Sequence, residues 1–152
     1  MKHLKVLVIL FVLGIGVSLE SQAQEVGIRF GNVNGNNVAV DGILALGDFS
    51  RIHANVSFGG DGVGIDAIWH PLFRPVGNSD FMWYAGFGPS LFLGDPFVFG
   101  AAGEVGIEYP IRDVPITIGV DYRPVFVIVE ETSFRGNGFG FNIRWRFGPN
   151  NS

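Results

Sequence analysis

Large apolar residues alternate with small or polar ones along nearly the whole chain from residue 25 onward. The last such stretch, Phe139 to Phe147, reads FGFNIRWRF and places a bulky apolar side chain at every second position. Successive side chains of a β-strand point to opposite faces, so this period of two predicts strands rather than helices. We expect eight strands, at 25–32, 37–46, 51–58, 62–70, 81–93, 97–109, 115–128 and 137–147.

Turn residues separate these eight segments. The stretch 32–37 contains the Asn-Gly pair that is typical of a tight hairpin. Stretches 47–50, 59–62 and 94–96 are short and rich in glycine and aspartate. The longer connections 70–80 and 110–115 each contain two prolines, which interrupt strand pairing. Strands joined by such turns predict one all-β domain of antiparallel, up-and-down topology.

Sorting each strand by parity gives two very different faces. One face is uncharged and often bulky. The other carries many glycines and a set of charges in which five arginines face five carboxylates. We expect this second face to form a charge network, whose members are Arg29, Asp41, Arg51, His53, Asp66, Glu104, Glu108, Asp121, Arg123, Arg144 and Arg146.

The N-terminus has the pattern of an export signal. Lys2 and Lys5 precede an apolar run from Val6 to Val17, and the small residues Ser21 and Ala23 fit a signal-peptidase site. The run is shorter than the ~20 residues that a membrane-spanning helix needs. We therefore expect residues 1–23 to be a cleaved signal peptide and residues 24–152 to form the barrel domain.

Composition narrows the chemistry further. Charged residues make up only 16% of the chain, against about 25% in typical soluble domains. Without residues 1–23, eight basic and 13 acidic residues remain, a net charge of −5, and all eight basic residues are arginine. The sequence contains no basic patch, so we do not expect nucleic acid as a partner. The chain has no cysteine, which excludes disulfides, a thiol nucleophile, cysteine metal sites and lipoprotein acylation.

Two architectures fit the alternating strands. A soluble lipocalin-like barrel would turn the apolar face inward, whereas an outer-membrane barrel would turn it outward to lipid. The glycines of the polar face favour the second, because small residues leave room for charged pairs inside a narrow barrel. The use of arginine alone also favours it, because guanidinium groups suit buried pairing. So does the aromatic girdle that we expect from Trp69, Trp83, Tyr109 and Trp145 at one end of the strands.

In length, pattern and C-terminal strand, the chain resembles the small eight-stranded outer-membrane proteins of the OmpA/OmpX type. The resemblance implies a transmembrane β-barrel of a Gram-negative outer membrane, monomeric and surrounded by lipid. It also implies that Phe147, which ends the strand FNIRWRF, is the residue read by the barrel-assembly machinery. We expect the interior to be filled by side chains and the role to be structural or surface-interacting.

Three sets of residues could suggest other chemistry. His53 and His70 should lie near each other inside the barrel, and we interpret them as polar interior residues rather than metal ligands. A Ser57–His53–Asp66 triad is disfavoured because Ser57 lies four positions from His53, more than about 10 Å at ~3.4 Å per residue. Glu104 and Glu108 are better explained as salt-bridge partners than as a glycosidase pair. We thus expect no enzyme activity, metal or cofactor. A soluble apolar-ligand binder, a small lipid-modifying membrane enzyme and a narrow channel remain as alternatives.

Overall fold

The structure is a computed structural model that describes residues 2–4, 6–7, 10, 24–33, 36–46, 50–59, 62–95, 97–129, 132–136 and 138–147. Most of the expected signal segment, 1–23, lies outside the described residues, as does the end of the chain from 148. Within the described part, no helix is long and apolar enough to cross a bilayer.

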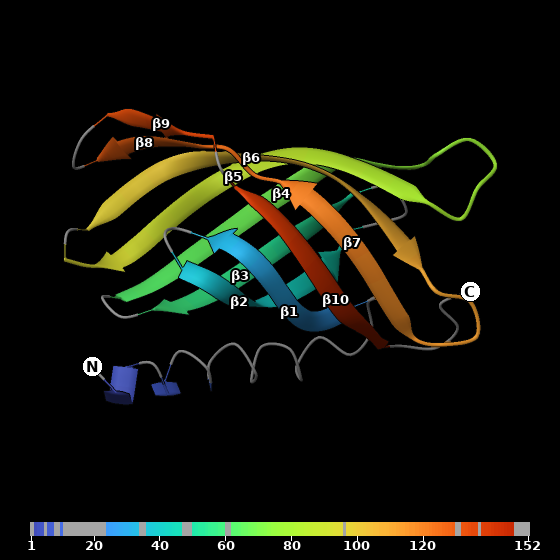
Figure 1. Ribbon diagram of the computed structural model, residues 1–152, viewed down its shortest axis with the longest axis horizontal. Helices are drawn as coiled ribbons and strands as arrows, with labels where there is room; N and C mark the ends of the chain where they lie inside the picture. The colour runs from blue at the N-terminus through green and yellow to red at the C-terminus, as the bar shows by residue number, and fades with distance from the viewer. Residues whose placement is uncertain are drawn as a thin grey trace.

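Ten strand segments form a single antiparallel sheet that closes on itself (Figure 1). Neighbours in the sequence pair from β1 to β7, while β10 pairs with both β7 and β1 and so closes the ring. The expected all-β barrel of antiparallel strands is confirmed. The segments are β1 (Gln24–Val33), β2 (Asn36–Ala45), β3 (Arg51–Gly59), β4 (Gly62–Pro75), β5 (Met82–Gly94), β6 (Val98–Pro110), β7 (Ile116–Tyr122), β8 (Val125–Val129), β9 (Ser133–Arg135) and β10 (Phe139–Phe147).

The ten segments make eight wall strands. β7 and β8 are one strand interrupted at Pro124, since both pair with β6. Proline has no N–H, so Pro124 accepts a hydrogen bond from Gly103 N at 2.9 Å and donates none in return. β9 and β10 likewise make up the eighth strand. β9 was not expected, because its residues fall between the two predicted strands 115–128 and 137–147.

β4 is longer than expected. It runs to Pro75 instead of ending near His70, which shortens the connection to β5. Beyond His70 this strand pairs only with β5, because β3 begins at Arg51, the partner of His70. Pro71 and Pro75 are tolerated there because no described strand pairs with them on the β3 side. The register of β4 on β5 shifts between Trp69 and Leu72, around Pro71.

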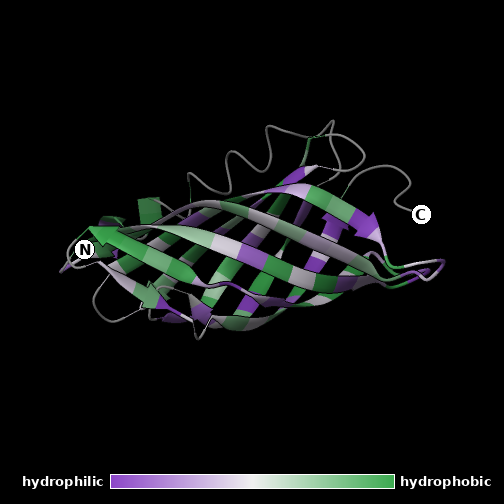
Figure 2. Cartoon of the chain, turned by 90° about the horizontal axis from the view of Figure 1, so that it is seen from above, coloured by the Kyte–Doolittle hydropathy of each residue, from purple (hydrophilic) through white to green (hydrophobic). Residues whose placement is uncertain are grey.

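The barrel has a polar interior and an apolar exterior. Apolar and polar residues alternate along each strand in Figure 2. The bulky apolar residues of β10 all face outward, and Phe139 is 68% exposed. Val56 and Val63 have the same outward parity but are buried. At one end the interior becomes apolar, in a cluster formed by Ile68, Val98, Ala102, Val125 and Val127, with Phe92 packed against it.

Candidate functional site: the buried charge network

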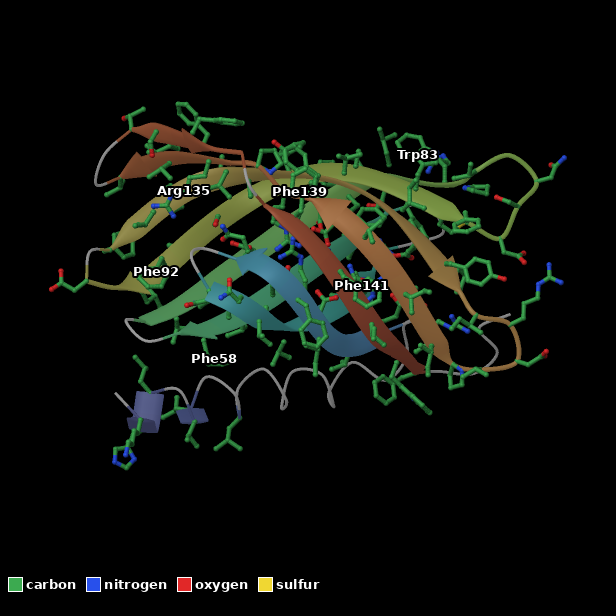
Figure 3. The ribbon with its side chains drawn as sticks, in the orientation of Figure 1. Phe58, Trp83, Phe92, Arg135, Phe139 and Phe141 are labelled. Carbon is green, nitrogen blue, oxygen red and sulfur yellow. The ribbon has the colours of Figure 1, made fainter. Side chains whose placement is uncertain are left out.

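Charged side chains fill the middle of the barrel (Figure 3). Of the eleven residues expected in the network, ten are buried and none of these is more than 4% exposed: Arg29, Asp41, Arg51, His53, Asp66, Glu104, Glu108, Asp121, Arg123 and Arg144. They come from nearly every wall strand. A barrel of eight strands encloses a space that side chains can fill, and this set fills it with charge.

Arg29 of β1 forms the first ion pair of the network. Its guanidinium binds Asp121 of β7, with Nε donating to Oδ2 at 3.0 Å and a second, very short contact from Nη2. Nη1 also donates to the carbonyl of Asn32 at 3.0 Å. A Cβ atom on Gly140 would collide with this guanidinium. The glycine on the polar face therefore makes room for a buried ion pair, as the sequence pattern predicts.

Glu108 of β6 joins two arginines from opposite sides. Arg51 donates to it through both terminal nitrogens, at 2.8 and 2.9 Å. Arg144 of β10 also donates to Glu108, and further to Glu25 at 3.1 Å and Asp41 at 3.3 Å. Bidentate geometry of this kind is specific to the planar guanidinium. Replacement of these arginines by lysine would not preserve it.

Arg51 is also held by two aromatic rings. Its guanidinium carbon lies 4.2 Å from the ring centre of Phe73 and 4.6 Å from that of Tyr84. Cation–π contacts of this kind are stronger when the cation is desolvated. Arg51 therefore has a fixed position, which matters for the histidine beside it.

Arg123 bridges the other end of the network. It lies between β7 and β8 and donates to Asp66 of β4 at 2.9 Å and to Glu104 of β6 at 2.7 Å. Ser90 donates a hydrogen bond to the other carboxylate oxygen of Asp66, Oδ1, at 2.6 Å. The interruption of the wall strand before Pro124 thus coincides with the arginine that ties β4, β6 and β7 together.

His53 of β3 lies between two carboxylates. Its Nδ1 is 3.0 Å from Glu104 Oε2, and its Nε2 makes a very short contact with Asp41. Arg123 Nη2 also lies near Nδ1, but at the longer distance of 3.4 Å. An ionised carboxylate can only accept, so each ring nitrogen carries a proton when it forms the two shorter contacts. These contacts therefore indicate that His53 is protonated on both ring nitrogens, as an imidazolium ion.

His70 has the opposite arrangement. Arg51 Nε donates to its Nδ1 at 3.0 Å, so that nitrogen carries no proton. Its Nε2 then carries the proton and donates to Glu104 Oε2 at 2.7 Å. The contact with Arg51 therefore describes His70 as a neutral imidazole of fixed tautomer.

These protonation states balance the charge of the interior. Four arginines and five carboxylates are buried among the described residues. A protonated His53 supplies the fifth positive charge, whereas a neutral His70 adds none. Buried charges are tolerated when they are paired and hydrogen-bonded, and among the buried residues that the structure describes this count leaves none in excess; Glu25 and Arg146, which are only partly buried, lie outside it.

His53, His70 and Glu104 also have the spacing of a metal site, because their candidate ligand atoms lie within 4.8 Å of one another. A histidine that binds a metal normally donates its other N–H to an acceptor. His53 meets this condition through Asp41, but Nδ1 of His70 faces the donor Arg51. The surrounding hydrogen bonds therefore favour protons over a metal ion at this cluster.

The structure does not assemble the catalytic sets considered from the sequence. Both ring nitrogens of His53 are engaged by carboxylates, which leaves neither to accept a proton from Ser57. Asp66 binds Arg123 and Ser90. Glu104 and Glu108 both have arginine partners, as expected.

Arg146 differs from the sequence expectation. It is half-buried, and no carboxylate lies within ion-pair distance of it in the described part of the chain. It donates instead to Thr117 Oγ1 at 2.9 Å and to the carbonyls of Ile111, Val114 and Ile116 at 2.8 to 3.0 Å. Arg146 therefore holds the turn between β6 and β7, while Arg144, two residues earlier, carries the ion pairs.

The expected girdle residues Trp69, Trp83, Tyr109 and Trp145 have outward parity, and Trp69 and Trp145 are 44% and 49% exposed. Trp83 and Tyr109 lie near strand ends, whereas Trp69 lies inside β4 because that strand is longer than predicted. Phe147 is the last residue of β10; it pairs with Gln24 at the start of β1 and is half exposed.

Sequence reasoning missed one member of the network and placed another inside the barrel without its contacts. Glu25 binds Arg144 and accepts a hydrogen bond from Thr117 at 2.7 Å. Its parity with Arg29 on the same strand could have revealed it. Tyr84 is fully buried beside Arg51 and His70, and its ring stacks on His70 at 4.6 Å. The strand parity marked it as inward, but only the register shows what it touches.

Comparisons of the chain with protein-family models, with curated proteins and with solved structures find no match. The network itself therefore supplies the evidence on function.

Proposed function

We propose that this protein is an integral outer-membrane β-barrel with a structural or surface-interaction role and no enzyme activity. The observation that carries the proposal is the reversed polarity of the barrel, with ion pairs inside and large apolar side chains outside. An exterior of this kind is unfavourable in water, because contiguous apolar patches on soluble proteins are small. In a bilayer, it is the surface that lipid-exposed strands require.

The soluble, lipocalin-like alternative has less support. It requires an apolar interior for an apolar ligand, whereas the middle of this barrel contains paired charges. The small apolar cluster around Val98 and Val127 is itself buried and packed. A histidine-based enzyme requires a ring nitrogen that is available to accept a proton, and the ring nitrogens of His53 and His70 are all engaged in the described network.

Cell fractionation tests the proposal directly. We expect the processed chain to sediment with the outer membrane and to migrate faster on a detergent gel before heating than after it. Recovery of the chain as a soluble periplasmic protein without detergent would refute the proposal.

A channel function is tested separately. Ion pairs and the apolar cluster occupy the interior, so we expect no conductance steps in a planar bilayer. Defined unitary steps from the purified, folded barrel would support the narrow-channel alternative instead.

A further inference from the structure

The outer wall of the barrel carries an open apolar groove of about 680 Å³. It crosses the neighbouring strands β5, β6, β7 and β10. Figure 3 labels a residue at each end, with Trp83 toward the β4–β5 and β6–β7 turns and Phe139 nearer the middle of the barrel. The outward-facing residues that line the groove are Trp83, Val105, Ile107, Val120, Tyr122 and Phe139.

Strand pairing explains the shape of this groove. Its floor is aliphatic, because Ile107 lies opposite Trp83 and Val105 lies opposite Tyr122. The ring of Tyr122 contacts that of Phe139, with ring centres 4.7 Å apart, and the two stand at the end away from Trp83. Four strands at the usual spacing give the groove a length of roughly 14 Å. An extended hydrocarbon chain fits a narrow apolar groove of this length.

A cation lies beside the Trp83 end of the groove. Arg74 of β4 is directly opposite Trp83 of β5, so the two side chains share the outward face. Arg135 of β9 is opposite Val125 and therefore has inward parity. Arg74 is thus the one charged residue at an outward position of the described strands. Arginine on the lipid face is unfavourable at the midplane of a bilayer and tolerated near the interface, so Arg74 indicates the level of the headgroups.

A phospholipid matches the groove and the cation together. Its phosphate accepts hydrogen bonds from a guanidinium, and one of its acyl chains matches the aliphatic floor. Arg74 Nη1 donates to the carbonyl of Phe73 at 3.1 Å. A guanidinium has five N–H donors, so a phosphate can bind while this contact is kept.

The wall of a second copy of the chain is a poorer match. It would have to bring an anion to Arg74, but no carboxylate has an outward position in the described strands. Asp121 also borders the groove, yet its carboxylate turns inward and binds Arg29. A phospholipid carries its own anion and is the apolar partner present in excess around a membrane barrel.

We propose that this groove is a binding site for one phospholipid. Its phosphate binds Arg74 beside Trp83, and one acyl chain lies along the floor toward Phe139. The site rests on the proposed membrane barrel, because only a bilayer presents phospholipid to the outer wall. It differs from the surrounding lipid in that the bound molecule stays with the chain in detergent.

Native mass spectrometry tests the site on the full barrel, purified in a maltoside detergent and titrated with palmitoyl-oleoyl-phosphatidylglycerol. We expect one lipid to be retained per chain. Arg74→Gln should weaken binding about tenfold, because charge-assisted hydrogen bonds are lost. Arg112→Gln is the matched control. It removes the same charge from an exposed turn, where Arg112 pairs with Asp80 at 2.8 Å, and it should leave binding unchanged.

A second pair of variants tests the path of the acyl chain and does not depend on Arg74. Val105→Phe should weaken binding roughly tenfold, because the ring displaces about two methylene groups from the floor. Val38→Phe is the control, since Val38 lies on β2, outside the groove, and is 47% exposed against 49% for Val105. It should have no effect on binding.

Inorganic phosphate in excess separates a lipid site from an anion site. Displacement of the lipid by phosphate, or full binding in Val105→Phe, would show that Arg74 binds anions without the groove and would overturn the proposal. Absence of retained lipid, equal binding in variants and controls, or lipid-free dimers would overturn it as well. Variants are scored in protein that shows heat-modifiable migration, so these results leave the barrel intact. Recovery of the unmodified chain as a soluble protein refutes the proposed function instead.

Discussion

His53 Nδ1 lies 3.0 Å from Glu104 Oε2, a contact that links β3 to β6 through the interior of the barrel. The other ring nitrogen of His53 faces Asp41 on β2. One imidazolium ion thus bridges carboxylates from two strands that do not adjoin each other.

Replacement of this histidine should be costly. We expect His53→Gln to lower the free energy of unfolding by about 3–5 kcal/mol, because two buried carboxylates lose their shared cation. Urea unfolding of the barrel in phospholipid vesicles, followed by tryptophan fluorescence, measures the change. His70→Gln is the matched control. His70→Gln should lower the free energy of unfolding by only about 1 kcal/mol, since a neutral amide can replace a neutral imidazole as donor and acceptor. Equal losses from the two variants would contradict the assigned protonation states.

The two arginines of the last strand should differ in importance. Arg144 has three carboxylate partners, whereas Arg146 donates to carbonyls and a hydroxyl. We expect Arg144→Met to reduce the folded fraction after refolding far more than Arg146→Met, because it leaves several buried carboxylates without their cation. The fast-migrating band on an unheated detergent gel reports the folded fraction. A larger loss from Arg146→Met would contradict the division of roles.

A glycine at the closing seam should resist even a small substitution. A Cβ on Gly27 of β1 would overlap the backbone of Ile143 and Arg144 on β10. We expect Gly27→Ala to destabilise the barrel by about 1–3 kcal/mol through overpacking. Gly42→Ala, on the neighbouring strand, is the control, because the nearest atoms to its Cβ are carbonyl oxygens at 3.8 and 3.9 Å. Its effect should stay within about 0.5 kcal/mol. Urea midpoints of the two variants give the comparison, and similar midpoints would count against a tight seam.

The histidine pair should not retain zinc. Arg51 holds His70 in the tautomer whose Nε2 carries a proton, so a metal would have to displace that proton. We expect folded protein that has been equilibrated with Zn²⁺ and desalted to contain no stoichiometric metal by elemental analysis. We also expect its unfolding midpoint to be unchanged by a chelator. One zinc per chain that is lost in His53→Gln would show that the site is a metal centre.

The sequence predicted the fold well because alternation is a local property. Each residue's parity indicates its face, and the faces of Asp41, Glu104 and Arg144 could be assigned without knowledge of any pairing. Proline is a less reliable signal, because its effect on a strand depends on the neighbouring strands. Pro71 and Pro75 were expected to end a strand, but they continue β4 because β3 does not extend beside them.

Pairing between charges could not be predicted in the same way. It depends on how strands that are distant in the chain are placed around the barrel. Arg29 of β1 and Asp121 of β7, for example, are 92 positions apart. The same limit explains Arg146. Its parity placed it with the lumen charges, yet its position near the end of β10 brings it to the β6–β7 turn, beyond the carboxylates. Glu25, at the start of β1, was missed because strand ends are the least certain part of a parity argument.

The charge network also constrains the order in which the barrel can fold and close. Arg144 on β10 reaches Glu25, 119 positions earlier, and Asp41, 103 positions earlier. These contacts exist only after the last strand has met the first. Until then Glu25 and Asp41 lack the cation that Arg144 supplies. In the membrane barrel proposed above, an unclosed wall would expose these charges to hydrocarbon, which does not accommodate them. Closure of the ring and completion of the charge network are therefore one event.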